Sequence, residues 1–178
     1  VGVDDPERVL FDALIPLSEG TSYNAYLIEG ETANALIDTA EPEVSEAFLE
    51  RLDRAIQATP SRRLDYVISN HAEQDHSGSI PLVLERYKEA VLVTNSKCHS
   101  MLEDLLDLPA ERVRLVADGD RLDLGGRELQ FLEMAWVHWP ETMVTWLPDA
   151  HALFPCDLFG AHQATGGQRA DWASVEAS

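Results

Sequence analysis

A short segment, residues 70–78, concentrates side chains of the types that bind metal ions. Within six positions it holds His71, Glu73, Asp75 and His76. In an extended chain, residues two apart point to the same side, so the first three can converge while the second histidine approaches from the following turn. Carboxylates and imidazoles without a thiolate suit iron or manganese better than a four-coordinate structural zinc. The alternative is a solvated polar loop in which an acid or a serine caps a helix.

Two residues much further along the chain complete this candidate site. His138 lies among large apolar side chains between two strand-like runs, where a histidine by itself is more often structural. Asp157 follows an apolar run, and a carboxylate at the end of a buried strand is costly unless it is paired or bound to a metal. Such a carboxylate can bridge two cations and hold them close enough to share one diatomic ligand. We therefore predict that both residues join the first four in one metal site.

The elements around these residues alternate between strand and helix patterns. The segment 70–78 follows an apolar strand, and α/β folds place their sites where a strand ends and a helix begins. Apolar spacing predicts helices over residues 42–58, 79–87 and 100–108. Strands are predicted at residues 23–28, 35–38, 66–69, 91–94, 113–116, 129–132, 143–146 and 152–154, with a hairpin loop at 148–150. The alternation indicates a layered α/β domain with helices outside its sheets.

Composition narrows the class of protein. The chain has 178 residues, of which 45% are hydrophobic and 25% charged, as expected for one globular domain with a core. Its 13 basic and 32 acidic residues give a net charge of −19, which repels phosphate backbones, so we expect no nucleic-acid partner. No apolar run reaches the roughly 18 residues of a membrane span, and residues 1–7 show no basic, apolar leader, so a cytoplasmic protein without a membrane partner is expected. Cys98 and Cys156 form no Cys-x-x-Cys unit, which disfavours a zinc-thiolate site.

Several segments of the chain resemble the diiron domain of flavodiiron proteins, also called A-type flavoproteins, a branch of the metallo-β-lactamase-like fold. These segments are residues 21–28, 36–39, 70–78, 138–143 and 154–160. Glu73 is the most specific mark, because most hydrolases of this superfamily are zinc enzymes with a histidine at the matching position. The resemblance implies an αββα sandwich that is incomplete at the C-terminus. Residues 1–162 would form the N-terminal part of the diiron domain, and residues 163–178 a tail or severed connection.

The resemblance also implies a role for each candidate residue. One iron would be bound by His71, Glu73 and His138. The second iron would be bound by Asp75 and His76, with the carboxylate of Asp157 bridging the pair. In the family, one more histidine ligand of the second iron and a flavodoxin-like domain lie beyond the point that this chain reaches. We expect the nearby His162 to contact solvent or the surroundings of the site rather than iron.

Three functional hypotheses follow from these residues and the resemblance. Flavodiiron proteins reduce dioxygen to water, nitric oxide to nitrous oxide, or both, which implies a diiron oxidoreductase core. Electrons would come from FMN on a flavodoxin-like domain or partner, from rubredoxin or from a flavin reductase, usually within a homodimer. The first alternative is a flavin-free diiron sensor that binds dioxygen reversibly. The second is a zinc hydrolase acting on a thioester, lactam or phosphodiester, against which Glu73 argues.

Overall fold

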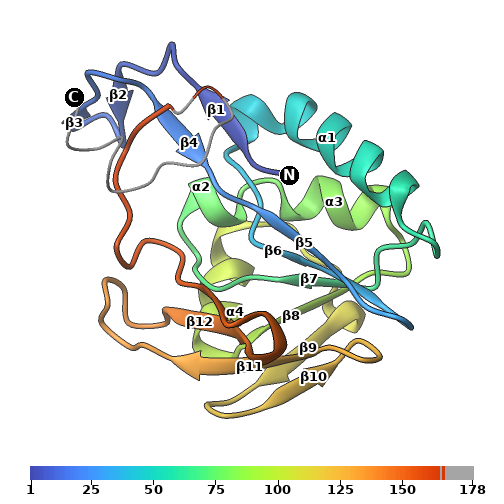
Figure 1. Ribbon diagram of the computed structural model, residues 1–178. Coiled ribbons are helices and arrows are strands. Elements are labelled where there is room, and N and C mark those ends of the chain that lie inside the picture. Colours follow the sequence, from blue (N-terminus) through green and yellow to red (C-terminus); the bar gives the residue numbers. More distant parts are fainter. Residues whose placement is uncertain (165, 167–178) are drawn as a thin grey trace.

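Apolar strands from the first two thirds of the chain pair into a five-stranded sheet (Figure 1). The computed structural model describes residues 1–164 and 166. The strand order in this sheet is β5 (Tyr26–Glu29), β6 (Asn34–Ile37), β7 (Tyr66–Ile68), β8 (Val91–Asn95) and β9 (Val113–Val116). β5 and β6 form an antiparallel hairpin, whereas β6 to β9 run parallel. Parallel neighbours need crossover connections, and helices supply them between β6, β7 and β8 and between β8 and β9.

Strands from the later part of the chain form a second, antiparallel sheet of four strands. Its order is β10 (Arg121–Asp123), β11 (Glu128–Glu133), β12 (Met143–Leu147) and β13 (Ala152–Phe154). The predicted loop at 148–150 is confirmed as a 3-10 turn, η3 (Pro148–Ala150), between β12 and β13. Two small sheets lie outside these layers: β1 (Val3–Asp5) pairs with β4 (Thr21–Tyr23), and β2 (Leu10–Phe11) pairs with β3 (Ile15–Pro16).

The main helices cover one face of the five-stranded sheet, and the four-stranded sheet covers the other (Figure 1). These helices are α1 (Ser45–Ala58), which continues the 3-10 turn η1 (Pro42–Val44), α3 (Ile80–Arg86) and α4 (Ser96–Leu105). Because side chains alternate along a strand, Leu36 packs among the helices while Ile37 packs against Phe131 of the second sheet. The expected layered α/β architecture is confirmed, and no helix covers the outer face of the second sheet within the described residues.

One predicted strand is divided in the structure. The pattern at residues 23–28 predicts a single strand, but the chain leaves β4 after Tyr23 and enters β5 at Tyr26. β4 pairs with β1 and β5 pairs with β6, so the chain changes partner between the two strands. The other predicted strands are present within one or two residues at each end. The predicted tail at 163–178 lies almost entirely outside the described residues.

The third predicted helix is displaced. We expected it at residues 100–108, but α4 begins four residues earlier, at Ser96, and ends at Leu105. Its start is fixed by Asn95, whose side-chain oxygen accepts a hydrogen bond of 2.8 Å from the Cys98 N–H. The helices predicted at 42–58 and 79–87 are confirmed as η1 with α1 and as α3. Within the described residues, no helix has the length and apolar character needed to cross a membrane.

Candidate metal centre

The loop that follows β7 is held rigidly between the two sheets by Asn70, which is fully buried. The N–H of Asn70 donates to Asp38 over 2.8 Å, and its carbonyl oxygen accepts from the N–H of Met143 at 2.9 Å. Its side-chain oxygen accepts a third bond, of 2.8 Å, from the Thr145 hydroxyl. Asp38 follows β6, whereas the other two partners belong to β12 of the second sheet. The residues after Asn70 therefore start from a backbone position that both sheets determine.

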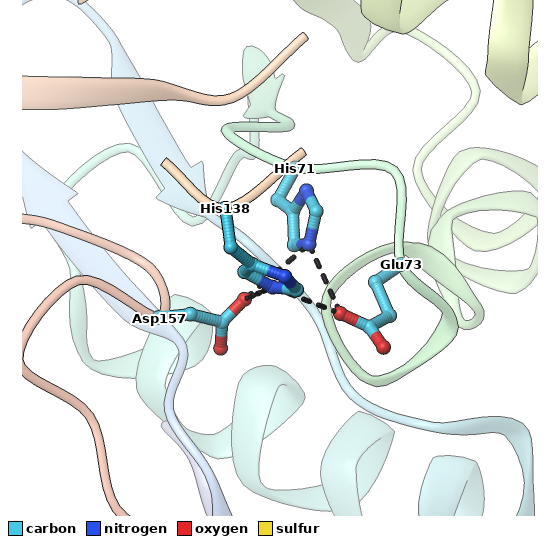
Figure 2. A group of neighbouring side chains, drawn as sticks. All are labelled: His71, Glu73, His138 and Asp157. Atoms are coloured by element: carbon cyan, nitrogen blue, oxygen red, sulfur yellow. Dashed lines mark hydrogen bonds and ion pairs between the residues drawn. The ribbon is translucent and has the colours of Figure 1, made fainter. Parts of the chain in front are cut away.

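Four candidate residues from three separate segments point their polar atoms at one place (Figure 2). Nε2 of His71 lies 3.1 Å from Oε2 of Glu73 and 3.3 Å from Oδ2 of Asp157. Nε2 of His138 lies 3.3 Å from the same oxygen of Glu73 and 3.1 Å from the same oxygen of Asp157. Two imidazole nitrogens and two carboxylate oxygens thus surround a common centre. This set is called the first ligand group below.

A second ligand group adjoins the first and consists of Asp75, His76 and Asp157. Nε2 of His76 lies 2.9 Å from Oδ1 of Asp157 and 3.5 Å from Oδ2 of Asp75. Asp157 therefore presents one oxygen to each group, which is the geometry that a bridging carboxylate requires. All six candidate residues are brought together by the fold.

The loop after β7 departs from the expected alternation at Asp75. We expected His71, Glu73 and Asp75 to share one side of an extended segment. Residues 74–77 instead form the short helix α2 (Gln74–Ser77), so Asp75 lines the same cavity as Glu73 but belongs with His76 to the second group. The capping alternative is not observed either, since neither α2 nor α3 has a side-chain hydrogen bond at its N-cap.

Burial and close charges shift the protonation equilibria of the site. Burial lowers the pKa of His71, but its hydrogen bonds to Glu141 and Glu73 outweigh burial and raise this pKa to about 9. Burial raises the pKa of Asp75 to about 6. For Asp157 burial acts in the same direction, but the hydrogen bond from His76 and the neighbouring imidazoles bring its pKa well below the usual range. The fold thus holds carboxylates and imidazoles close enough that each alters the protonation of its neighbours.

The residues present fit a pair of metal cations. The donor set is rich in carboxylates and imidazoles and contains no thiolate, which suits iron or manganese. Oδ1 of Asp75 is buried and has no hydrogen-bond partner within the described part of the chain. A buried carboxylate oxygen without a partner is costly, and a bound cation would compensate it.

Comparison with known proteins identifies the family of this domain. A family model described as "ODP family beta lactamase" matches residues 21–176. The chain belongs to this family. The type A flavoprotein fprA of Rhodobacter capsulatus is 39% identical over 168 residues, which cover 93% of this chain and 38% of the relative. The coenzyme F420H2 oxidase of Methanothermobacter marburgensis is 39% identical over 81% of this chain and 36% of the relative.

Solved structures of related proteins share the fold. The flavodiiron protein from Giardia intestinalis superposes with a TM-score of 0.89 at 32% identity, over 99% of this chain and 42% of that chain. The rubredoxin oxygen:oxidoreductase from Desulfovibrio gigas superposes with a TM-score of 0.85 at 32% identity, over 95% of this chain and 41% of that chain. The resemblance to flavodiiron proteins is therefore confirmed, together with the metallo-β-lactamase-like fold. The chain spans about two fifths of the length of each of these four proteins.

The ligand groups of this ODP-family domain lie at the base of a cavity of about 620 Å³. The β2–β3 hairpin, β4 and the residues after β13 form its walls. His162 lies in this wall, where its Nδ1 is 3.1 Å from the Thr21 hydroxyl and its ring packs on Phe11, outside both ligand groups. Trp139 packs edge-on against His71, with ring centroids 5.0 Å apart. About half of the His138 side chain is exposed, so the first group is reached from this cavity.

Two buried acids beside the ligand groups were missed by the sequence analysis. Asp38 lies 3.5 Å from Nδ1 of His76, and Glu141 lies 2.7 Å from Nδ1 of His71. Asp38 directly follows the apolar run of β6, and Asp157 follows the apolar run that contains β13, so the same sequence pattern marks both acids. Glu141 follows a proline in a turn, and no pattern in its own segment marks it as buried.

Proposed function

We propose that this domain is the diiron core of an oxidoreductase that reduces dioxygen to water, nitric oxide to nitrous oxide, or both. The observation that carries the proposal is the position of Asp157, which offers one carboxylate oxygen to each ligand group. Two cations bridged in this way lie close enough to act on one small ligand together. Relatives named as an oxidase of coenzyme F420H2 and as a rubredoxin oxygen:oxidoreductase support redox chemistry with dioxygen.

In this proposal the first iron is held by His71, Glu73 and His138, and the second by Asp75 and His76. The Asp157 carboxylate would be shared by the two ions. A ferrous pair, when bound, would supply the binding place for the gas and two electrons, and the external donor would supply the other two that reduction of dioxygen to water requires. The carboxylate of Glu73, at a position where most zinc hydrolases of the superfamily have a histidine, favours iron over zinc.

The chain's own residues contribute orientation and exclusion of water. Asn70 fixes the start of the loop that carries two of the ligands, His71 and Glu73, which holds them in place before a metal binds. The Trp139 ring against His71 supplies an apolar wall on one side of the first group. We further propose that electrons arrive from a reduced flavin, carried by a flavodoxin-like domain or partner, or from rubredoxin. The proposed assembly is a homodimer.

Reconstitution with ferrous iron under anoxic conditions tests this function. We expect about two irons per domain, and consumption of dioxygen or nitric oxide when a flavin reductase, FMN and NADH are supplied. Asp157→Asn should abolish gas consumption, because it weakens the only carboxylate shared by both groups among the described residues. Asp149→Asn, at an exposed position outside both groups, is the matched control and should keep it.

Other outcomes of the same experiment decide against the proposal. A stable oxygen adduct without net turnover in the presence of donor would identify a sensor instead. Preferential binding of zinc, with no gas consumption and with hydrolysis of a thioester or lactam, would identify a hydrolase.

A further inference from the structure

Glu141 is a buried acid that belongs to neither ligand group, yet it contacts a member of the first. Only 2% of its surface is exposed. Its Oε1 accepts two hydrogen bonds, one of 2.7 Å from Nδ1 of His71 and one of 3.0 Å from the N–H of Ala72. Both the ring of His71 and the backbone next to it are therefore attached to the same carboxylate oxygen.

The backbone of Glu141 is itself held by a third element. Its carbonyl oxygen accepts a bond of 2.7 Å from the side-chain amide of Asn95, whose other atom, Oδ1, caps α4 through the N–H of Cys98. Glu141 thus connects the start of α4, the segment before β12 and the loop after β7. Because both the main chain and the side chain of Glu141 are held by hydrogen bonds, Glu141 restricts rotation of the His71 ring.

Burial of the Glu141 side chain lowers the free energy of unfolding, which is consistent with a role at the site and not in stability. Oε2 of Glu141 is buried and has no hydrogen-bond partner in the described part of the chain. Its other oxygen, Oε1, is fully engaged by the His71 ring and the Ala72 N–H. A buried polar oxygen without a partner destabilises the fold, whereas an apolar side chain of similar size would not.

We propose that Glu141 is a positioning residue that fixes the His71 ring for metal binding. When Nε2 binds a metal ion, the ring keeps a single proton, and the Glu141 carboxylate, 2.7 Å from Nδ1, holds that proton on Nδ1. The lone pair of Nε2 is then directed at the centre shared with Glu73 and Asp157. Nε2 lies 3.1 Å from Oε2 of Glu73 and 3.3 Å from Oδ2 of Asp157. The inference deepens the proposed function and rests on it only for the identity of the metal.

Zinc binding to the 178-residue chain tests the inference without any redox chemistry. Zinc affinity can be measured by competition with a chromogenic chelator. Because zinc is diamagnetic, the Nδ1 proton of His71 can also be followed by ¹H–¹⁵N NMR in the zinc-loaded protein. Glu141→Leu removes the acceptor, and we expect zinc affinity at the first group to fall about 10- to 100-fold with loss of the hydrogen-bonded Nδ1 proton signal. Glu141→Gln keeps an accepting oxygen without the charge. It should lose less affinity, with the proton signal moved upfield because a neutral acceptor makes a weaker bond.

Asn34→Ala separates positioning from a general loss of stability. Asn34, at the start of β6, is also buried and lies outside both ligand groups. Its side-chain amide donates hydrogen bonds to Thr59, Ser61 and Arg63. This variant should lower the free energy of unfolding in urea while leaving zinc affinity and the His71 signal unchanged.

Two results would overturn the inference. One is a Glu141→Leu protein that binds zinc as tightly as the unaltered chain. The other, which decides the matter even if that variant does not fold, is a Glu141→Gln protein with an unchanged Nδ1 resonance. The proposed function fails on different data: an iron-loaded chain that consumes no gas contradicts the oxidoreductase, whatever the zinc affinities of the Glu141 variants.

Discussion

Among the individual side chains, Glu73 bears most directly on the proposed preference for iron. It supplies a carboxylate to a group whose nitrogens come from two histidines. Its pKa is lowered by the hydrogen bond from His71, so it stays ionised and contributes negative charge to the first group. A hard oxygen donor at this position favours iron, whereas an imidazole would make the group more like a zinc site.

Replacement of Glu73 by histidine should therefore change metal selectivity. We expect Glu73→His to raise the ratio of bound zinc to bound iron when the protein is loaded from an equal mixture of the two ions. Metal analysis of the desalted protein measures this ratio. Glu133→His adds the same side chain at an exposed position at the end of β11 and should leave the ratio unaltered. An unchanged ratio in the Glu73 variant would show that geometry, not ligand type, sets the preference.

At the scale of elements, the short helix α2 carries the second ligand group and is tightly enclosed. Gly78 follows α2 with an ordinary helical backbone, at φ −60°. A Cβ at this position would lie 2.6 Å from the carbonyl oxygen of Gln74 and 2.6 Å from Cδ of Pro42, at the start of η1. The glycine is thus required by close packing between α2 and η1, not by its backbone angles.

Gly78→Ala should displace α2 and weaken the second ligand group selectively. Because Asp75 and His76 move with the helix, we expect bound iron to fall from about two toward about one per chain. Gly119→Ala is the control: its φ is +81° and a Cβ there meets nothing within 4 Å. It should cost about 1–2 kcal/mol of folding free energy without altering the iron content. Two irons in the Gly78 variant would show that α2 can shift without disturbing its ligands.

The elements also show what the sequence could predict. Strands such as β7 and β8 were found because apolar runs of this length, separated by helical patterns, belong to a buried parallel sheet. The shortest strands, β2 and β3, were missed because each has two residues and no room for a periodic pattern. The six candidate ligands were found from residue type and position. Glu141 was not, because its role depends on contacts with distant residues that no local pattern records.

At the scale of the whole molecule, the site connects parts of the fold that the sequence separates. The ligands come from the loop after β7, from α2, from the segment before β12 and from the segment after β13. The carboxylates Glu73, Asp75 and Asp157 also repel one another in a chain whose net charge is already −19. Bound cations would remove this repulsion and join the two sheets at the same time.

Metal should accordingly stabilise the entire domain, not only the site. A ligand that binds only the folded state contributes about 2.7 kcal/mol at 100 times its dissociation constant, which for a chain of this size raises Tm by about 5–10 °C. Differential scanning fluorimetry under anoxic conditions, with and without ferrous iron, measures the shift. Asp157→Asn should reduce the shift most, because this residue belongs to both ligand groups, whereas Asp149→Asn should retain it. A metal-induced shift of equal size in both variants would mean that the ion stabilises the protein from a different place.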